Sequence, residues 1–170
     1  HLSYENQLAH KFEEVKTHLS NNDFDPSVVK PVIGMSEPFH YRNKMEFTFG
    51  KDGTLGMHEQ GNFRKVVDIS DCLIASNDTM VIRNVVSKWQ HTHELSGYDK
   101  MAHEGLLRHL MIRHSQVTGE YMVAIFATES PEQYTEIINE LLLVLINLDI
   151  DIESILWMKN VDVADRAQSG

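Results

Sequence analysis

The residues best suited to chemistry lie in an alternating stretch, residues 41–50, with the sequence Tyr-Arg-Asn-Lys-Met-Glu-Phe-Thr-Phe-Gly. Side chains of a β-strand alternate between two faces, which places Arg42 and Lys44 together on a polar face. The apolar side chains at positions 45, 47 and 49 fall on the opposite face, toward a core. A guanidinium and an ammonium group on one rigid face suit a polyanion. The alternative is an ordinary sheet strand whose polar face meets only solvent.

The histidines and the cysteine offer less chemistry. The 10 histidines are scattered, without an HExxH pair or a Cys/His ribbon, and we interpret most of them as surface residues. The single cysteine, Cys72, excludes an internal disulfide and fits a reducing, cytoplasmic compartment. Taken alone, Cys72 is typical of a small buried hydrophobic residue.

Short turns and strands must position the Arg42 strand. Asp52-Gly53 is a hairpin signal, and strands over 55–59 and 63–69 would complete a three-stranded meander. Upstream, an apolar stripe predicts a helix over residues 3–19, with Ser3 as its cap. The residues of the stripe are Tyr4, Leu8, Phe12, Val15 and Leu19.

In the second half of the chain, segments with the apolar spacing of a helix again alternate with segments that have the spacing of a strand. We expect a helix over 77–93 capped by Asn77 or Asp78, a hairpin of strands 106–114 and 121–128, and a last strand over 152–159. Ser130 with Gln133 three residues later predicts a capped helix start, and the wide apolar face that follows predicts a mostly buried helix. The tail to Gly170 has no closing element. The fold class is therefore α+β, with a mainly antiparallel sheet and packed helices.

The bulk composition sets further limits. A chain of 170 residues with 42% hydrophobic residues is enough for one domain with a real core. No apolar run approaches the roughly 18 residues of a membrane helix, and no signal peptide is visible. The net charge of −10 argues against a strongly basic nucleic-acid module. We expect a monomer that makes no membrane contact.

Five groups of residues, taken together and in order, resemble one family: the central part of the bacterial RNA uracil-5-methyltransferases. The resemblance covers nearly the whole chain. The groups are Leu2 to Leu8 with Lys11; Tyr41-Arg42-Asn43-Lys44 with Glu46-Phe47 and Phe49-Gly50; Gly56 and His58 with Asp68-Ile69 before Cys72; Gly105 to Arg113 with Thr118-Gly119-Glu120; and Ser154-Ile155 with Asn160.

The resemblance implies that the chain is a fragment: residues 1–170 would be the central domain of an enzyme that methylates carbon 5 of uridine in tRNA or rRNA. Segments 1–72 and 77–160 would be its two halves, without the family's N-terminal β-barrel and cluster region and its C-terminal S-adenosylmethionine domain. The family's nucleophilic cysteine and general base lie in that last domain, so no catalytic residue is expected here. RNA contacts are expected from Arg42, Lys44, Arg108 and Arg113.

The resemblance also implies cofactors of the intact enzyme. Cys72 matches the fourth ligand of an iron–sulfur cluster whose other three cysteines lie upstream in the family. One thiolate cannot hold a four-cysteine cluster, and no glycine-rich cofactor loop follows a strand. We therefore expect neither a [4Fe–4S] cluster nor S-adenosylmethionine on the chain by itself. The rival hypothesis is a free-standing acidic α+β domain that binds a protein partner.

Overall fold

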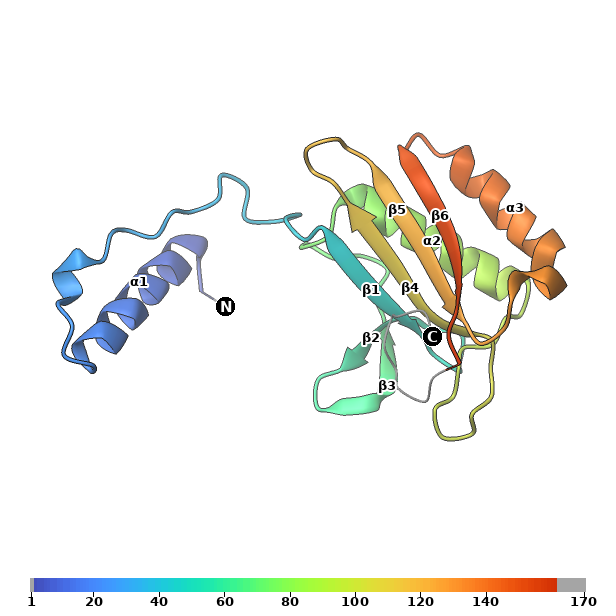
Figure 1. Ribbon diagram of the computed structural model, residues 1–170, viewed down its shortest axis with the longest axis horizontal. Helices are drawn as coiled ribbons and strands as arrows, with labels where there is room; N and C mark the ends of the chain where they lie inside the picture. Colours follow the sequence, from blue (N-terminus) through green and yellow to red (C-terminus); the bar gives the residue numbers. More distant parts are fainter. Residues whose placement is uncertain (1, 162–170) are drawn as a thin grey trace. The chain divides into compact units, whose positions relative to one another are not determined.

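The computed structural model describes residues 2–161, shown in Figure 1. The predicted polar tail therefore lies almost entirely outside the described residues. The chain forms two compact units, one before and one after the boundary between Phe39 and His40. The two segments 1–72 and 77–160 inferred from the sequence do not follow this boundary, because strands of both lie in the sheet of the second unit.

The first unit is built around helix α1, Tyr4–Ser20. The predicted cap is confirmed: the Ser3 hydroxyl accepts a hydrogen bond from the backbone N–H of Asn6 at 3.3 Å. The extended chain that follows returns to α1, where the Tyr4 hydroxyl accepts a hydrogen bond from the N–H of Met35 at 2.7 Å. None of the 17 residues of α1 is buried, so the apolar stripe is only partly covered.

The second unit is one six-stranded sheet with the order β3-β2-β1-β4-β5-β6. Its strands are β1 (Lys44–Phe49), β2 (Leu55–Glu59), β3 (Asn62–Asp68), β4 (Leu107–His114), β5 (Tyr121–Ala127) and β6 (Ile152–Lys159). Every neighbouring pair is antiparallel except β5 and β6, which run parallel. The expected α+β class is confirmed.

Strand β1 lies inside the sheet and follows the predicted alternation. Met45 and Phe47 are completely buried and Phe49 is 1% exposed, whereas Lys44 and Glu46 face solvent. The strand is shorter than expected, because Arg42 lies outside it. The Arg42 N–H instead donates to the Ile74 carbonyl at 2.9 Å, which pairs this residue with the segment before the next helix.

Helices α2 (Asn77–Thr92) and α3 (Thr135–Ile146) cover one face of the sheet, and Figure 1 shows α2 passing behind the strands. The Trp89 indole N–H joins the two helices by donating to the Ile137 carbonyl at 2.7 Å. The cap of α2 is Ser76 and neither Asn77 nor Asp78: its hydroxyl accepts from the N–H of Thr79 at 3.1 Å.

Helix α3 differs most from the prediction. A 3₁₀ turn occupies Pro131–Tyr134, Ser130 makes no side-chain cap, and the α-helix begins only at Thr135. Only Leu141 and Leu145 of the helix are buried; three apolar side chains are at least half exposed, namely Leu143, Val144 and Ile146. The helix connects the parallel strands β5 and β6, a crossover that places it at the border of the sheet, where fewer neighbours cover it.

Candidate functional site

Two of the four predicted RNA-contacting residues meet across neighbouring strands. Lys44 on β1 is directly opposite Arg113 on β4. Directly paired residues share one face, with Cβ atoms about 4.5–5.5 Å apart. Both side chains are exposed, and they project from the face opposite the helices, since Met45 and Ile112 beside them belong to the core under α2.

Arg42 extends this cationic group. It is exposed, and its Nε donates to the Lys44 carbonyl at 3.2 Å, which holds the guanidinium beside that strand end. Glu46 offsets part of the charge through an ion pair with Lys44 at 2.5 Å. Arg42, Lys44 and Arg113, called here the strand cations, form a local basic patch in an acidic chain.

Arg108 does not belong to this patch. It is 1% exposed, and its Nη1 donates to the backbone carbonyl and the side-chain oxygen of Asn160 at 3.1 and 3.2 Å. The reason is a bulge: Leu107 is paired with Ala127 and His109 with Phe126, so Arg108 is an extra residue whose side chain is turned inward. This burial favours a structural role for Arg108 over the expected RNA contact.

Cys72 is half-buried at the edge of the hydrophobic core. No group of three or more histidine, cysteine or acidic side chains suited to a metal ion occurs among residues 2–161. Cys72 is the single thiol of this chain, so the chain could supply one of the four ligands of a four-cysteine cluster. The loop after the parallel strand β5, with Thr128, Glu129 and Ser130, contains no glycine.

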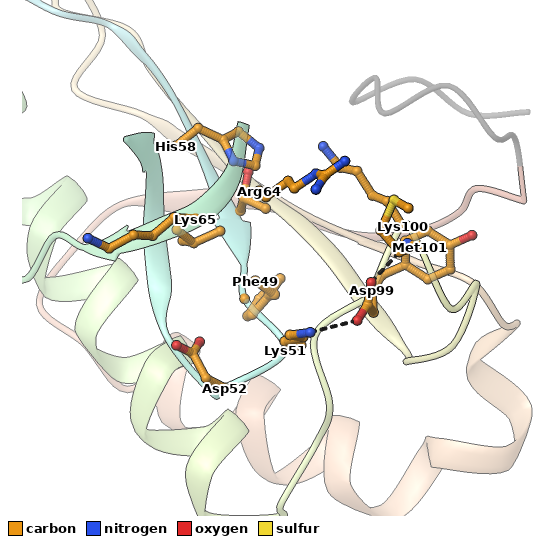
Figure 2. A pocket seen from close by; sticks show the side chains of 13 residues that line it. Phe49, Lys51, Asp52, His58, Arg64, Lys65, Asp99, Lys100 and Met101 are labelled. Atoms are coloured by element: carbon orange, nitrogen blue, oxygen red, sulfur yellow. Dashed lines mark hydrogen bonds and ion pairs between the residues drawn. The ribbon is translucent and has the colours of Figure 1, made fainter. Parts of the chain in front are cut away.

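A cavity of about 280 Å³ lies at the other end of β1, and the sequence did not indicate it. Figure 2 shows its lining, which comes from β1 and the turn after it, from β2 and β3, and from the loop at residues 98–101. The lining includes Thr48, Lys51, Asp52, His58, Arg64, Lys65, Tyr98, Asp99 and Lys100. We call it the meander pocket. Four cations, a histidine and two carboxylates line it, and two of the cations are paired, Lys51 with Asp99 and Lys65 with Glu59.

Glycines hold the 98–101 loop against the turn after β1. A Cβ atom on Gly97 would collide with the backbone of Gly50, and one on Gly105 would collide with the backbone of Gly97. Gly105 also has a φ of 113°, which residues with side chains rarely adopt. The close backbone approach brings Tyr98 and Asp99 beside Lys51, whose ammonium lies 3.0 Å from the Asp99 carboxylate.

The two carboxylates of the meander pocket stabilise its loops. The backbone N–H of Met101, followed by Lys51, lowers the pKa of Asp99. The hydroxyl of Thr54 likewise lowers the pKa of Asp52, with a hydrogen bond of 2.7 Å. Both groups are therefore ionised acceptors with defined local donors. This arrangement suits loop fixation.

Comparison with known proteins finds relatives that are named as RNA methyltransferases. No protein-family model matches the chain. It is 35% identical over 149 residues to an uncharacterized RNA methyltransferase of Clostridium tetani, an alignment that covers 82% of this chain and 33% of that protein. A further uncharacterized RNA methyltransferase, from Clostridium acetobutylicum, is 33% identical over 173 residues, covering 96% of this chain and 37% of the relative.

A solved structure has the same fold. It is the Pyrococcus abyssi tRNA (uracil-54, C5)-methyltransferase in complex with S-adenosyl-L-homocysteine, at 24% identity and a TM-score of 0.74, with 99% of this chain and 38% of that chain covered. Within residues 2–161, no helix is long and apolar enough to cross a membrane. The chain is similar in sequence to one part of these RNA methyltransferases and spans about a third of their length.

Proposed function

We propose that this chain is the part of an S-adenosylmethionine-dependent RNA uracil-5-methyltransferase that positions the RNA, and that it is not catalytic by itself. The observation that carries the proposal is the pairing of Lys44 with Arg113, beside Arg42, on the face opposite the helices. In a chain of net charge −10, three cations at one strand end are placed where a phosphate backbone can be bound.

The reaction explains why such a surface is needed. Methylation of carbon 5 of uracil requires a nucleophile that adds to carbon 6 and a base that removes the carbon 5 proton. Neither is reached while the uridine is stacked, so the nucleotide must be turned out and held. The nucleophile and base would come from the remainder of the protein. The strand cations would hold the unpaired RNA segment that presents the uridine.

Both proposed RNA substrates, rRNA and tRNA, offer suitable single-stranded loops. Phosphate contacts fix register and orientation but do not read sequence, so the strand cations suit either RNA. The Pyrococcus abyssi protein is a methyltransferase of uracil 54 in tRNA, which supports tRNA as the first substrate to test. An iron–sulfur cluster with Cys72 as one ligand remains a proposal for the full-length protein, with the other ligands supplied from outside this chain.

A protein-binding role is the second candidate. It is favoured by the exposed apolar side chains on α3: Leu143 is 63% exposed, Val144 50% and Ile146 68%. Apolar groups gathered on one helix face are a common contact surface for another domain or protein. This role is compatible with an RNA enzyme, because the helix and the strand cations lie on different faces of the sheet.

The experiment that tests the proposed activity identifies the product. The full-length protein is incubated with S-adenosylmethionine and with unmodified tRNA or rRNA transcripts, and the RNA is digested and analysed by liquid chromatography and mass spectrometry. The expected product is 5-methyluridine. Methylation of a different base, or of the ribose, would reject the uracil-5 assignment while retaining an RNA methyltransferase. The absence of any methylated nucleoside with both RNAs would favour the protein-binding role.

A further inference from the structure

The meander pocket and the strand cations lie along one strand. Thr48 lines the pocket, and Lys44 belongs to the strand cations; both project from the same face of β1 because they are four residues apart. At about 3.4 Å per residue the two positions are separated by about 14 Å. A short single-stranded RNA segment that contacts Lys44 and Arg113 can therefore reach the pocket without crossing the sheet.

The groups around the pocket match the parts of a nucleotide. Arg64 and Lys100 supply positive charge for a phosphate, and a guanidinium matches phosphate geometry well. The Lys65 ammonium is instead paired with the Glu59 carboxylate at 2.8 Å. In Figure 2 the side chain of Arg64 points from β3 toward the loop that carries Lys100 and Met101. Tyr98 supplies an aromatic surface of the kind on which unpaired RNA bases stack.

Tyr98 is held in place before any ligand arrives. The guanidinium of buried Arg108 lies 4.5 Å from the centroid of its ring. Its hydroxyl lies 3.0 Å from His103 Nδ1, and its backbone N–H donates to the Leu107 carbonyl at 2.8 Å. A side chain fixed in this way loses little conformational freedom on binding, which favours affinity.

We propose that the meander pocket holds one nucleotide of the RNA, with its phosphate at Arg64 and Lys100 and its base against Tyr98. The inference rests on the proposed function and specifies a second contact on the same RNA strand. It gives Arg108 a positioning role through Tyr98 in place of direct RNA contact. An acidic protein segment could meet the same cations, but it would make no use of a fixed aromatic ring beside them.

The test measures binding of a fluorescein-labelled 12-residue oligouridylate to the full-length protein by fluorescence polarisation. Tyr98→Leu should weaken binding about tenfold, as expected for a lost base stack, whereas Tyr98→Phe should retain the affinity because the ring remains. Lys88→Ala, an exposed lysine on α2, is the matched surface control and should have no effect.

The proposed phosphate contact is tested separately with a double variant that carries Arg64→Ala and Lys100→Ala. This variant should reduce the slope of log affinity against log salt by about 0.7 for the single phosphate contact removed. A 5-iodouridine in the oligonucleotide should form a photo-crosslink to Tyr98, mapped by mass spectrometry. Circular dichroism of each variant checks that it is folded, and Arg64→Ala alters an exposed residue, so the test does not depend on Tyr98→Leu folding.

The outcomes separate the two proposals. Suppose Arg42→Ala and Arg113→Ala weaken RNA binding, while the pocket variants bind as the parent protein does and Tyr98 forms no crosslink. The nucleotide site is then wrong, and the RNA-positioning function stands. If the unaltered protein binds neither the oligouridylate nor tRNA and rRNA transcripts, both proposals fail. Equal losses for Tyr98→Phe and Tyr98→Leu would reject the stacking role.

Discussion

The guanidinium of Arg108 lies 4.5 Å from the ring centroid of Tyr98, with the arginine buried and the tyrosine at the wall of the meander pocket. The same guanidinium donates to the backbone carbonyl and side chain of Asn160. One bulge residue therefore joins the 98–101 loop to the end of β6. A buried cation fixed on two sides is a structural element, and this gives the first prediction.

Arg108→Ala should destabilise the chain by about 2–4 kcal/mol, because it removes charged hydrogen bonds and a desolvated cation–π contact. Arg113→Ala is the matched control: the same residue type on the same strand, but exposed, with an expected change within about 0.5 kcal/mol. Urea unfolding of both variants gives the comparison. Equal stability of the two would contradict the structural role of Arg108.

Gly97→Ala tests the backbone contact that forms the meander pocket. The new Cβ would meet the carbonyl of Gly50, which belongs to the backbone and cannot rotate away. We expect Gly97→Ala to lower the free energy of unfolding by more than about 1 kcal/mol, which is the cost of an ordinary substitution at a glycine with positive φ. Gly61→Ala supplies that reference, since Gly61 has a φ of 78° but no atom within 4 Å of the added Cβ. Thermal unfolding measures the loss of stability in both variants. A smaller loss for Gly97→Ala than for Gly61→Ala would show that the backbone contact is loose.

The lowered pKa of Asp99 predicts that the stability of the 98–101 loop depends on pH. The pKa of Asp99 is lowered below the ordinary value of 3.8, so the unfolded chain binds the proton more readily than the folded chain. The stabilisation by Asp99 is therefore present above pH 3.8 and is lost as the pH falls through the lower folded-state pKa.

The measurement compares Asp99→Asn with the parent chain in urea at about pH 7 and at about pH 2.5. The midpoint should be lower for the variant at the higher pH, and the difference should shrink at the lower pH. Asp71→Asn, at an exposed position before α2, is the charge-matched control. A difference that persists unchanged in acid would mean that the carboxylate charge is not what holds the loop.

Phe47→Ala tests the core face of β1. Phe47 is completely buried in the cluster beneath α2, and its truncation should cost about 3–5 kcal/mol. Glu46→Ala changes the neighbouring residue on the opposite, exposed face and should cost less than about 0.5 kcal/mol. Chemical denaturation measures the free energy of unfolding of both variants. Similar losses for Phe47→Ala and Glu46→Ala would mean that the faces of β1 are assigned incorrectly.

The sequence predicted best what depends on neighbouring residues. Alternation located β1, because one face of that strand meets the core, and the stripe with Ser3 located α1. The strands expected over 55–59 and 152–159 match β2 and β6. The cap of α2 was missed by one residue since Ser76, Asn77 and Asp78 are all good caps in a row. Periodicity also showed that α3 is apolar, but it could not show that the border of the sheet covers only part of that surface.

The site was predicted only in part, for reasons of long-range geometry. Lys44 and Arg42 were identified from one strand, but their approach to Arg113 depends on the register between β1 and β4. The burial of Arg108 depends on a bulge and on Asn160, which lies 52 residues further along the chain. The meander pocket draws on three separated segments joined through glycine contacts, so no local pattern marks it.

The central claim, that this chain positions RNA through the strand cations, is tested most directly by Arg42→Ala in the full-length protein. Loss of a charge-assisted phosphate contact worth about 1–3 kcal/mol should weaken binding of tRNA or rRNA transcripts about tenfold or more. The affinity for S-adenosylmethionine, measured by calorimetry on the same preparation, should be unchanged. An RNA affinity equal to that of the parent protein at moderate salt would contradict the account and leave the polar face of β1 as a solvent-facing surface.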